Sequence, residues 1–195
     1  KALGWSPLPL TLKEARRAAQ QLAFGDKPCP PEEPSTAPLE IVVHDLWYAY
    51  DGRPVLRGVN LEVRRGECMA LMGRNGSGKT TLLKHLVGLL RPGRGSVRVR
   101  DMDTRRTSLE ELIGVVGYVP QNPDALLFAD TVREELAFTR ANHGLAEANR
   151  DMALLEQLGL AAQAARYPRD LSVGERQQVA LAAILAGQPE IILLD

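Results

Sequence analysis

The 195-residue sequence has no net charge, few cysteines and no long hydrophobic run. Its 24 Lys and Arg residues are balanced by 24 Asp and Glu residues, which gives no support to a nucleic-acid binder that relies on bulk phosphate neutralisation, although a local basic patch is compatible with this composition. The longest apolar run, residues 179–186, is far shorter than a membrane-spanning helix. Cys29 and Cys68 lack metal-ligand spacing, so we expect one linker thiol and one strand thiol in a reducing compartment rather than a disulfide. No signal-peptide pattern opens the sequence, and we expect a cytosolic chain.

The first 38 residues differ in composition and predicted structure from the rest of the chain. Residues 10–24 predict a short helix, because Thr11 followed by Glu14 is a capping-box pattern. Residues 25–38 place five prolines among charged and small residues, which is the composition of a semi-extended linker. We therefore expect a helical tail of a preceding unit at 1–24, a proline-rich linker at 25–38 and one domain at 39–195.

From residue 39 onward, predicted strands alternate with predicted helices. Strands are predicted at 39–50, 59–63, 67–73, 96–100, 114–121 (running into a loop) and 191–194. Helices are predicted after Lys79, across 131–165, and from 174 to 186. In the second of these, Thr131 and Glu134 form a capping-box pattern at the start, and Gly159 is a stop. The alternation indicates an α/β domain with a largely parallel sheet and a helical insertion between its halves.

A phosphate-binding loop is predicted between the third strand and the first helix of this domain. Residues 73–80, GRNGSGKT, match the pattern G-x-x-x-x-G-K-[ST] in its required strand–loop–helix context. The glycines let the backbone turn tightly with its N–H groups facing a polyphosphate, and the following helix adds its positive N-terminal end. Lys79 can reach the β- and γ-phosphates, and the Thr80 hydroxyl can bind Mg²⁺. The alternative is a glycine-rich turn with an exposed lysine. The predicted nucleotide-binding residues here are Gly73, Arg74, Asn75, Gly76, Ser77, Gly78, Lys79, Thr80 and Thr81.

Asp195 follows the apolar run IILL at 191–194. A P-loop ATPase needs a second strand that ends in a carboxylate holding the Mg²⁺ shell. We predict that strand 191–194 lies beside strand 67–73, is buried on both faces, and presents Asp195 to the metal where it emerges. Many core strands end in aspartate, so this assignment depends on the loop upstream.

Three further segments carry a family resemblance. DLSVGERQQVALAAIL at 170–185 is similar to the signature sequence of the ATP-binding-cassette (ABC) ATPases, usually LSGGQ. VVGYVPQ at 115–121 resembles the strand that leads to the family's Q-loop glutamine, which would be Gln121. Tyr50, six residues before Leu56, matches the family's adenine-stacking aromatic. The resemblance covers 39–195 in the right order and implies a P-loop NTPase core with an N-terminal antiparallel β part, a helical insertion at about 122–170, and an end at the Walker B strand.

The resemblance also implies roles for these residues. Gln121 would join Lys79 and Asp195 in catalysis, and Thr80, Gln121 and Asp195 would surround Mg²⁺. Ser172, Gly174 and Glu175 would approach the γ-phosphate of an ATP bound by a partner domain.

Each of these matches has an alternative. Gln121 could be an ordinary loop amide. Tyr50 could be a core aromatic, and Trp47 or Tyr48 could contact adenine instead. Ser172 and Glu175 form the pattern S-x-x-E, so a structural helix cap explains them too, and both roles are compatible. Val173 departs from the usual glycine of the signature.

A finer resemblance concerns residues 121–138, QNPDALLFADTVREELAF, which are similar to the corresponding segment of energy-coupling-factor importers. It implies an ATPase that drives vitamin or transition-metal uptake from the cytoplasmic face of the cell membrane. Its cofactors would be ATP and Mg²⁺. Its partners would be a second ABC domain, homo- or heteromeric and head to tail, and integral membrane subunits, with no nucleic acid. The helix and linker before residue 39 resemble the junction of a fused tandem ATPase, whose second cassette this would be.

The family's general-base glutamate and switch histidine follow the Mg²⁺ aspartate, and His44, His85 and His143 match no such motif. We therefore expect residues 1–195 alone to bind nucleotide and to hydrolyse it slowly. Two other functions are kept: a soluble ABC ATPase acting on ribosomes or DNA, and a nucleotide-binding module without catalysis of its own.

Overall fold

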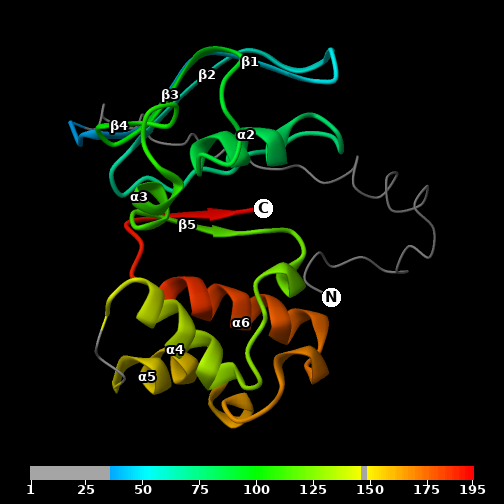
Figure 1. Cartoon of the computed structure of the whole chain (residues 1–195), viewed down its shortest axis with the longest axis vertical. Helices are drawn as coiled ribbons and strands as arrows, with labels where there is room; N and C mark the ends of the chain where they lie inside the picture. Colours follow the sequence, from blue (N-terminus) through cyan, green and yellow to red (C-terminus); the bar gives the residue numbers. More distant parts are fainter. Residues whose placement is uncertain (1–35, 146–148) are drawn as a thin grey trace, which may run out of the picture. The chain divides into compact units, whose positions relative to one another are not determined.

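The computed structural model describes residues 36–145 and 149–195. The helix expected at 10–24, most of the linker and Cys29 lie outside the described residues. One compact unit, Ala37–Asp195, contains the domain predicted at 39–195. Within it, Figure 1 shows an antiparallel sheet, helix α2, a pair of parallel strands and a group of three helices, in that order from top to bottom.

The antiparallel sheet is built around a hairpin. Strands β1 (Leu39–Tyr50) and β2 (Arg53–Arg64) are joined by Asp51 and Gly52, whose φ angles of 48° and 77° suit the two-residue turns that match strand twist. Strand β3 (Arg94–Val99) pairs with the other edge of β1, and β4 (Met102–Asp103) pairs with β3, giving the order β2-β1-β3-β4.

Gly95 is required where β3 passes an irregularity in β1. The register between these strands shifts between His44 and Trp47, and Asp45 has a φ of 42°. At Gly95, where φ is 84°, an added Cβ would lie 2.0 Å from the carbonyl oxygen of Asp45. Any other residue would therefore force the two strands apart.

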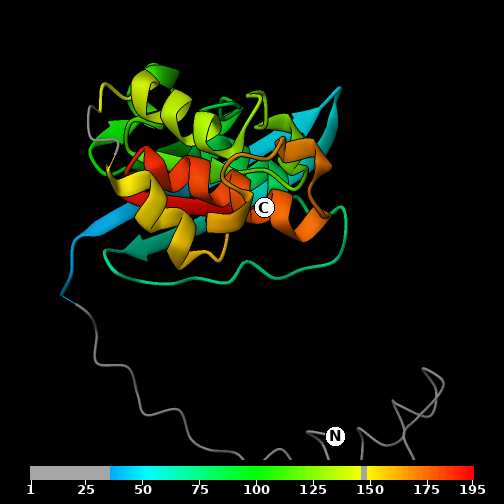
Figure 2. The same ribbon diagram turned by 90° about the horizontal axis from the view of Figure 1, so that it is seen from below.

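The second half of the domain contains two parallel strands and the helices. Strands β5 (Val116–Val119) and β6 (Ile191–Leu194) pair in parallel. The helices are α2 (Lys79–Leu86), α3 (Leu109–Ile113), α4 (Val132–Asn142), α5 (Asn149–Gln157) and α6 (Val173–Ala186), with 3-10 turns at Pro123–Ala125, Ala161–Gln163 and Pro168–Asp170. Figure 2, from below, shows α4, α5 and α6 packed side by side. None of the described helices has the length and apolar character needed to cross a bilayer.

Two hydrophobic cores lie on opposite faces of the β5–β6 pair. The first joins α2 to the antiparallel sheet and includes Val116 and Leu193. The second joins α4, α5 and α6 and includes Val119. The predicted α/β class, with an antiparallel part and a helical insertion, is confirmed, and β5–β6 is the parallel pairing among the described strands.

Several helix ends follow the predicted cap chemistry. The side chain of Thr131 accepts the N–H of Glu134 at the start of α4, and Ser172 forms a complete capping box with Glu175 at the start of α6. Helix α5 ends at Gln157, two residues before Gly159, whose φ is 72°. The helical stretch predicted at 131–165 is divided into α4, α5 and a 3-10 turn.

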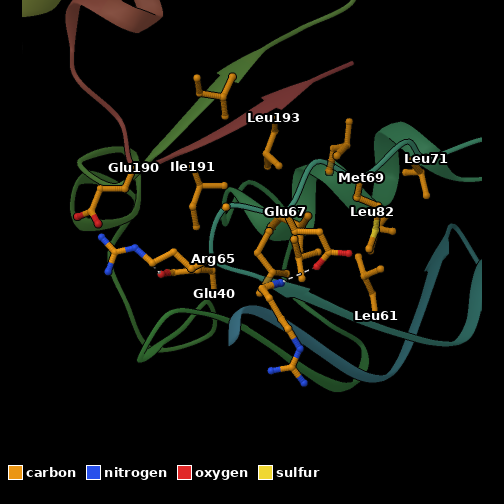
Figure 3. Close-up of a pocket in the computed structure, with 17 residues that line it drawn as sticks. Glu40, Leu61, Arg65, Glu67, Met69, Leu71, Leu82, Glu190, Ile191 and Leu193 are labelled. Atoms are coloured by element: carbon orange, nitrogen blue, oxygen red, sulfur yellow. Dashed lines mark hydrogen bonds and ion pairs between the residues drawn. The ribbon is translucent and has the colours of Figure 1, made fainter. Parts of the chain in front are cut away.

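The strand expected at 67–73 is not formed, and the expectation that it lies beside β6 is wrong. Among the described strands β6 pairs only with β5, and a groove of about 440 Å³ opens between residues 67–73 and β6. Figure 3 shows Ile191 and Leu193 of β6 on one side of this groove, and Met69, Leu71 and Leu82 of α2 grouped together on another. A strand exists only with a ladder partner, and residues 67–73 have none in the described part of the chain.

The exposure of β6 and of the segment before the phosphate loop corrects a second expectation. Strand β6 was predicted to be buried on both faces, but Ile192 is 43 % exposed and Leu194 is 63 % exposed. Met72, in the segment that leads into the phosphate loop, is 89 % exposed. Cys68, expected as a strand thiol, is an exposed free thiol in the same unpaired segment.

Candidate nucleotide-binding site

The predicted phosphate loop runs directly into α2, which begins at Lys79. Gly78, the residue before the helix, has a φ of 93°, and an added Cβ would lie 2.9 Å from Leu56 and 3.2 Å from Val55. The loop is therefore packed against the end of the β1–β2 hairpin, at a position where only glycine fits. The first N–H groups of α2 have no acceptor within the helix, so they are available to an anion.

Lys79 folds back over its own loop. Its ammonium group donates hydrogen bonds to the carbonyl oxygens of Gly73, at 2.9 Å, and Arg74, at 3.0 Å. The Ser77 N–H donates to the same Arg74 carbonyl, at 3.1 Å, which tightens the turn. The lysine charge is thus held at the mouth of the loop.

The remaining predicted loop residues differ in their exposure. Arg74, Asn75 and Gly76 are exposed, whereas Thr81 is buried. The carbonyl oxygen of Thr81 accepts a hydrogen bond of 2.7 Å from the Nδ1–H of His85 one turn further along α2.

The structure brings Asp195 to the first turn of α2. The Asp195 N–H donates to the carbonyl oxygen of Val119, at 3.0 Å, so the residue continues the parallel ladder by one position. The Thr80 hydroxyl donates to Asp195 Oδ1 at 2.8 Å, and the Tyr118 hydroxyl donates to Asp195 Oδ2 at 2.9 Å. Burial, reinforced by the Asp195 carboxylate, raises the pKa of Tyr118 to about 12, so this phenol remains a donor at neutral pH.

Tyr118 is a site residue that the sequence did not predict. It lies in the segment VVGYVPQ, but that pattern predicts only a strand and not the partner of one side chain. Its position opposite Leu193 depends on the parallel register of β5 and β6.

The Thr80–Asp195 pair is chemically suited to Mg²⁺. No group of three or more His, Cys, Asp or Glu side chains that could hold a metal occurs in residues 36–145 and 149–195. Mg²⁺ does not need one, because it is commonly held by one or two protein oxygens together with waters and nucleotide phosphates. A hydroxyl and a carboxylate beside a phosphate loop therefore fit this ion. Gln121 is exposed and lies in the loop directly after β5, at the same end of the parallel pair as Asp195.

The three candidate adenine aromatics have different surroundings. The Tyr48 ring packs edge-on against His85 of α2, with centroids 4.6 Å apart, and against Tyr50, at 4.9 Å. Trp47 has the guanidinium of Arg94 over its ring, 5.6 Å from the centroid. Tyr50 is 40 % exposed at the hairpin end. Trp47 is 39 % exposed, and the Tyr50 ring is itself a partner of Tyr48, so the choice of Tyr50 as the adenine contact stays a prediction.

The signature residues lie at the start of α6. The Ser172 N–H and hydroxyl both donate to Glu175 Oε2, at 2.9 and 2.7 Å, and these bonds lower the pKa of Glu175. Val173 is 60 % exposed, and an added Cβ at Gly174 would meet nothing within 4 Å. A depression lined by Gly174, Glu175 and Asp195 connects the start of α6 with the end of β6. Lys79 and Thr80 do not line it, because α2 lies on the other face of the β5–β6 pair.

The fold and the loop geometry define a nucleotide-binding domain of the P-loop class. More particularly, residues 56–195 match the family described as ABC transporter, and the chain belongs to that family.

Known relatives agree with this assignment. An energy-coupling factor transporter ATP-binding protein, EcfA, of Methanothermobacter thermautotrophicus is 47 % identical over 162 residues, which cover 80 % of this chain and 52 % of the relative. A putative ABC transporter ATP-binding protein of Streptomyces coelicolor is 40 % identical, covering 98 % of this chain and 40 % of the relative. The structure of cbiO1 from Clostridium perfringens, described as part of the ABC transporter complex cbiONQ, has a TM-score of 0.71 and 31 % identity, covering 80 % of this chain and 65 % of that one. The chain spans about half or less of the length of these curated relatives.

Proposed function

We propose that this chain binds ATP with Mg²⁺ at residues 73–80 and hydrolyses it, as one of two cassettes that energise a membrane importer. The observation that carries the proposal is the contact between Thr80 and Asp195. These residues are 115 positions apart, yet their hydroxyl and carboxylate oxygens lie 2.8 Å apart beside a phosphate loop. A purely structural glycine turn has no need of a carboxylate at that place.

The residues of the loop would act mainly by binding and orientation. The N–H groups of residues 73–80 and the start of α2 would surround the phosphates. The Lys79 ammonium would exchange its bonds to two loop carbonyls for bonds to phosphate oxygens, which carry full charge and are stronger acceptors. Mg²⁺, when bound, neutralises phosphate charge, and Thr80 and Asp195 are the residues that would hold it, with Gln121 as the third candidate.

The start of α6 supports pairing with a second ABC domain. Ser172 and Gly174 are exposed at a helix N-terminus, which favours an anionic ligand. Lys79 lies on α2, on the other face of the β5–β6 pair from the start of α6. A phosphate bound by Lys79 is therefore poorly placed to contact Ser172 of the same chain. A head-to-tail partner, identical or different, would instead bring its own bound ATP to Ser172. The phosphate would then compete with Glu175 for the Ser172 hydroxyl.

The segment after Gln121 supports docking of a membrane subunit. Phe128 is 72 % exposed, and its N–H and that of Ala129 donate to the buried carboxylate of Glu135 at 2.9 and 2.8 Å. The two hydrogen bonds fix the backbone at Phe128 while its apolar side chain stays exposed to solvent. Such an arrangement is expected for a residue that contacts another protein. From the relative named EcfA we infer an energy-coupling-factor role for this chain. The resemblance of residues 121–138 to such importers is the basis for proposing the cytoplasmic face of the membrane as its place and a vitamin or metal ion as the cargo.

The proposal is tested by nucleotide binding and by uptake. A fluorescent ATP analogue should bind the purified protein and be displaced by Mg²⁺-ATP, and absence of binding would contradict the proposal. In cells, Lys79→Ala in the full-length protein should abolish uptake. Undiminished uptake would favour a binding module without catalysis. Cosedimentation with ribosomes or DNA, rather than with a small integral membrane protein, would favour a soluble ABC ATPase.

A further inference from the structure

The alternation of side chains along β5 and β6 places two residues on the face that α2 covers. Gly117 faces α6, because an added Cβ there would lie 2.4 Å from Ile184. Tyr118 therefore points to the opposite face, and it packs against the core that contains α2. On β6, Leu193 belongs to that same core, so Asp195, two residues on, points the same way.

The two oxygens of the Asp195 carboxylate receive hydroxyl groups from different elements. Oδ1 accepts from Thr80 on α2, and Oδ2 accepts from Tyr118 on β5. With its N–H bonded to Val119, the residue is tied at three points, and these fix the plane of the carboxylate. The hydrogen bond from Thr80 would be lost when a metal ion binds, since the Thr80 hydroxyl is also a candidate metal ligand.

We propose that Tyr118 is a positioning residue for Asp195. Its hydroxyl holds Oδ2, so that Oδ1 keeps facing the first turn of α2 when the Thr80 hydroxyl turns toward a metal ion. This inference rests on the proposed function, because it gives Tyr118 its role through the metal that accompanies ATP. Tyr118 itself touches neither nucleotide nor metal in this arrangement.

Removing only the hydroxyl tests the idea. In Tyr118→Phe, the affinity of the ATP complex for Mn²⁺, measured by electron paramagnetic resonance in place of Mg²⁺, should fall roughly three- to tenfold, which corresponds to the loss of one hydrogen bond of ordinary strength. Binding of ATP in EDTA should not change. Tyr167→Phe is the matched control, because this half-exposed tyrosine lies in the helical layer, and it should change neither value.

A third variant separates positioning from packing. An Asp195→Ala variant has no side-chain carboxylate at position 195 for the Tyr118 hydroxyl to bind. Adding Tyr118→Phe to this variant should therefore leave its Mn²⁺ affinity unchanged. Unaltered Mn²⁺ affinity in the single Tyr118→Phe variant would overturn the inference while leaving the proposed function intact. An equal loss of ATP binding in EDTA would also overturn it, since that result indicates general damage. If the unmodified protein binds neither ATP nor Mn²⁺-ATP, the proposed function fails and this inference with it.

Discussion

The ammonium group of Lys79 lies 2.9 Å from the carbonyl oxygen of Gly73, so the lysine closes its own phosphate loop. The loop is therefore compact before any ligand binds, and the positive charge of Lys79 already lies beside the loop backbone. A phosphate has to replace two neutral carbonyl acceptors rather than capture a freely moving side chain.

The first prediction concerns this lysine. Lys79→Ala should weaken binding of a fluorescent ATP analogue by at least roughly tenfold, because a charge-assisted bond to phosphate is lost. Lys84→Ala, on the same helix, is the control and should bind like the unmodified protein. Equal effects of the two substitutions would show that the loss comes from α2 as a whole and not from the loop.

The second prediction separates the two roles of Ser172. Ser172→Ala should lower the free energy of unfolding by about 1 kcal/mol, as expected for a lost helix cap, and should also prevent ATP-dependent pairing with a second cassette. Ser108→Ala removes the same kind of capping box from α3 and serves as the control. Light scattering with ATP should show pairing in the Ser108 variant and not in the Ser172 variant. Pairing in both would leave Ser172 with the structural role alone.

The third prediction is a pH dependence of stability that originates at His85. The ring is fully buried, and this burial lowers its pKa by more than the bond to the Thr81 carbonyl raises it. Below its ordinary value of 6.5, the unfolded state binds a proton that the folded state does not, so the free energy of unfolding should fall as the pH decreases.

Urea unfolding at pH 7.5 and 5.5 measures this effect. The difference between the two pH values should shrink in His85→Gln and persist in His44→Gln, since His44 is an exposed strand residue. A difference of unchanged size in His85→Gln would assign the pH dependence to other groups.

The fourth prediction concerns the ion pair between α4 and α5. The Arg140 guanidinium lies 2.8 Å from the Asp151 carboxylate, and the two residues are only 9 % and 4 % exposed. Asp151→Ala should destabilise the protein by ~3–5 kcal/mol, because it leaves a buried guanidinium without its partner. Arg65→Ala breaks a looser pair, 3.9 Å long, between an exposed guanidinium and Glu40, and should cost at most about 1 kcal/mol because Glu40 keeps its pair with Arg100. Thermal unfolding of both variants provides the comparison, and similar losses would contradict the argument.

Much of the fold and part of the site could be predicted from local sequence patterns. The spacing of glycines and Lys79 predicts a phosphate loop, and the structure has that loop leading into α2 as expected. The caps at Thr131 and Ser172 and the helix stop at Gly159 were predicted correctly, because the chemistry of a helix end lies within a few residues of the chain.

Other features depended on partners far away in the sequence. Residues 67–73 have the composition of a strand, but strand formation needs a second backbone, and none of the described strands pairs with them. The surroundings of the three aromatic residues at 47–50 likewise depend on distant parts of the chain, since Tyr48 packs against α2 and Trp47 against Arg94.

By itself, the sequence predicted the phosphate-loop pattern and determined where most helices begin and end, since those properties arise from neighbours along the chain. Only the tertiary structure decided that the Thr80 and Tyr118 hydroxyls meet on Asp195. The physical reason is that such a meeting depends on the register of two parallel strands and on the face that a helix covers, and neither is encoded within a single local segment.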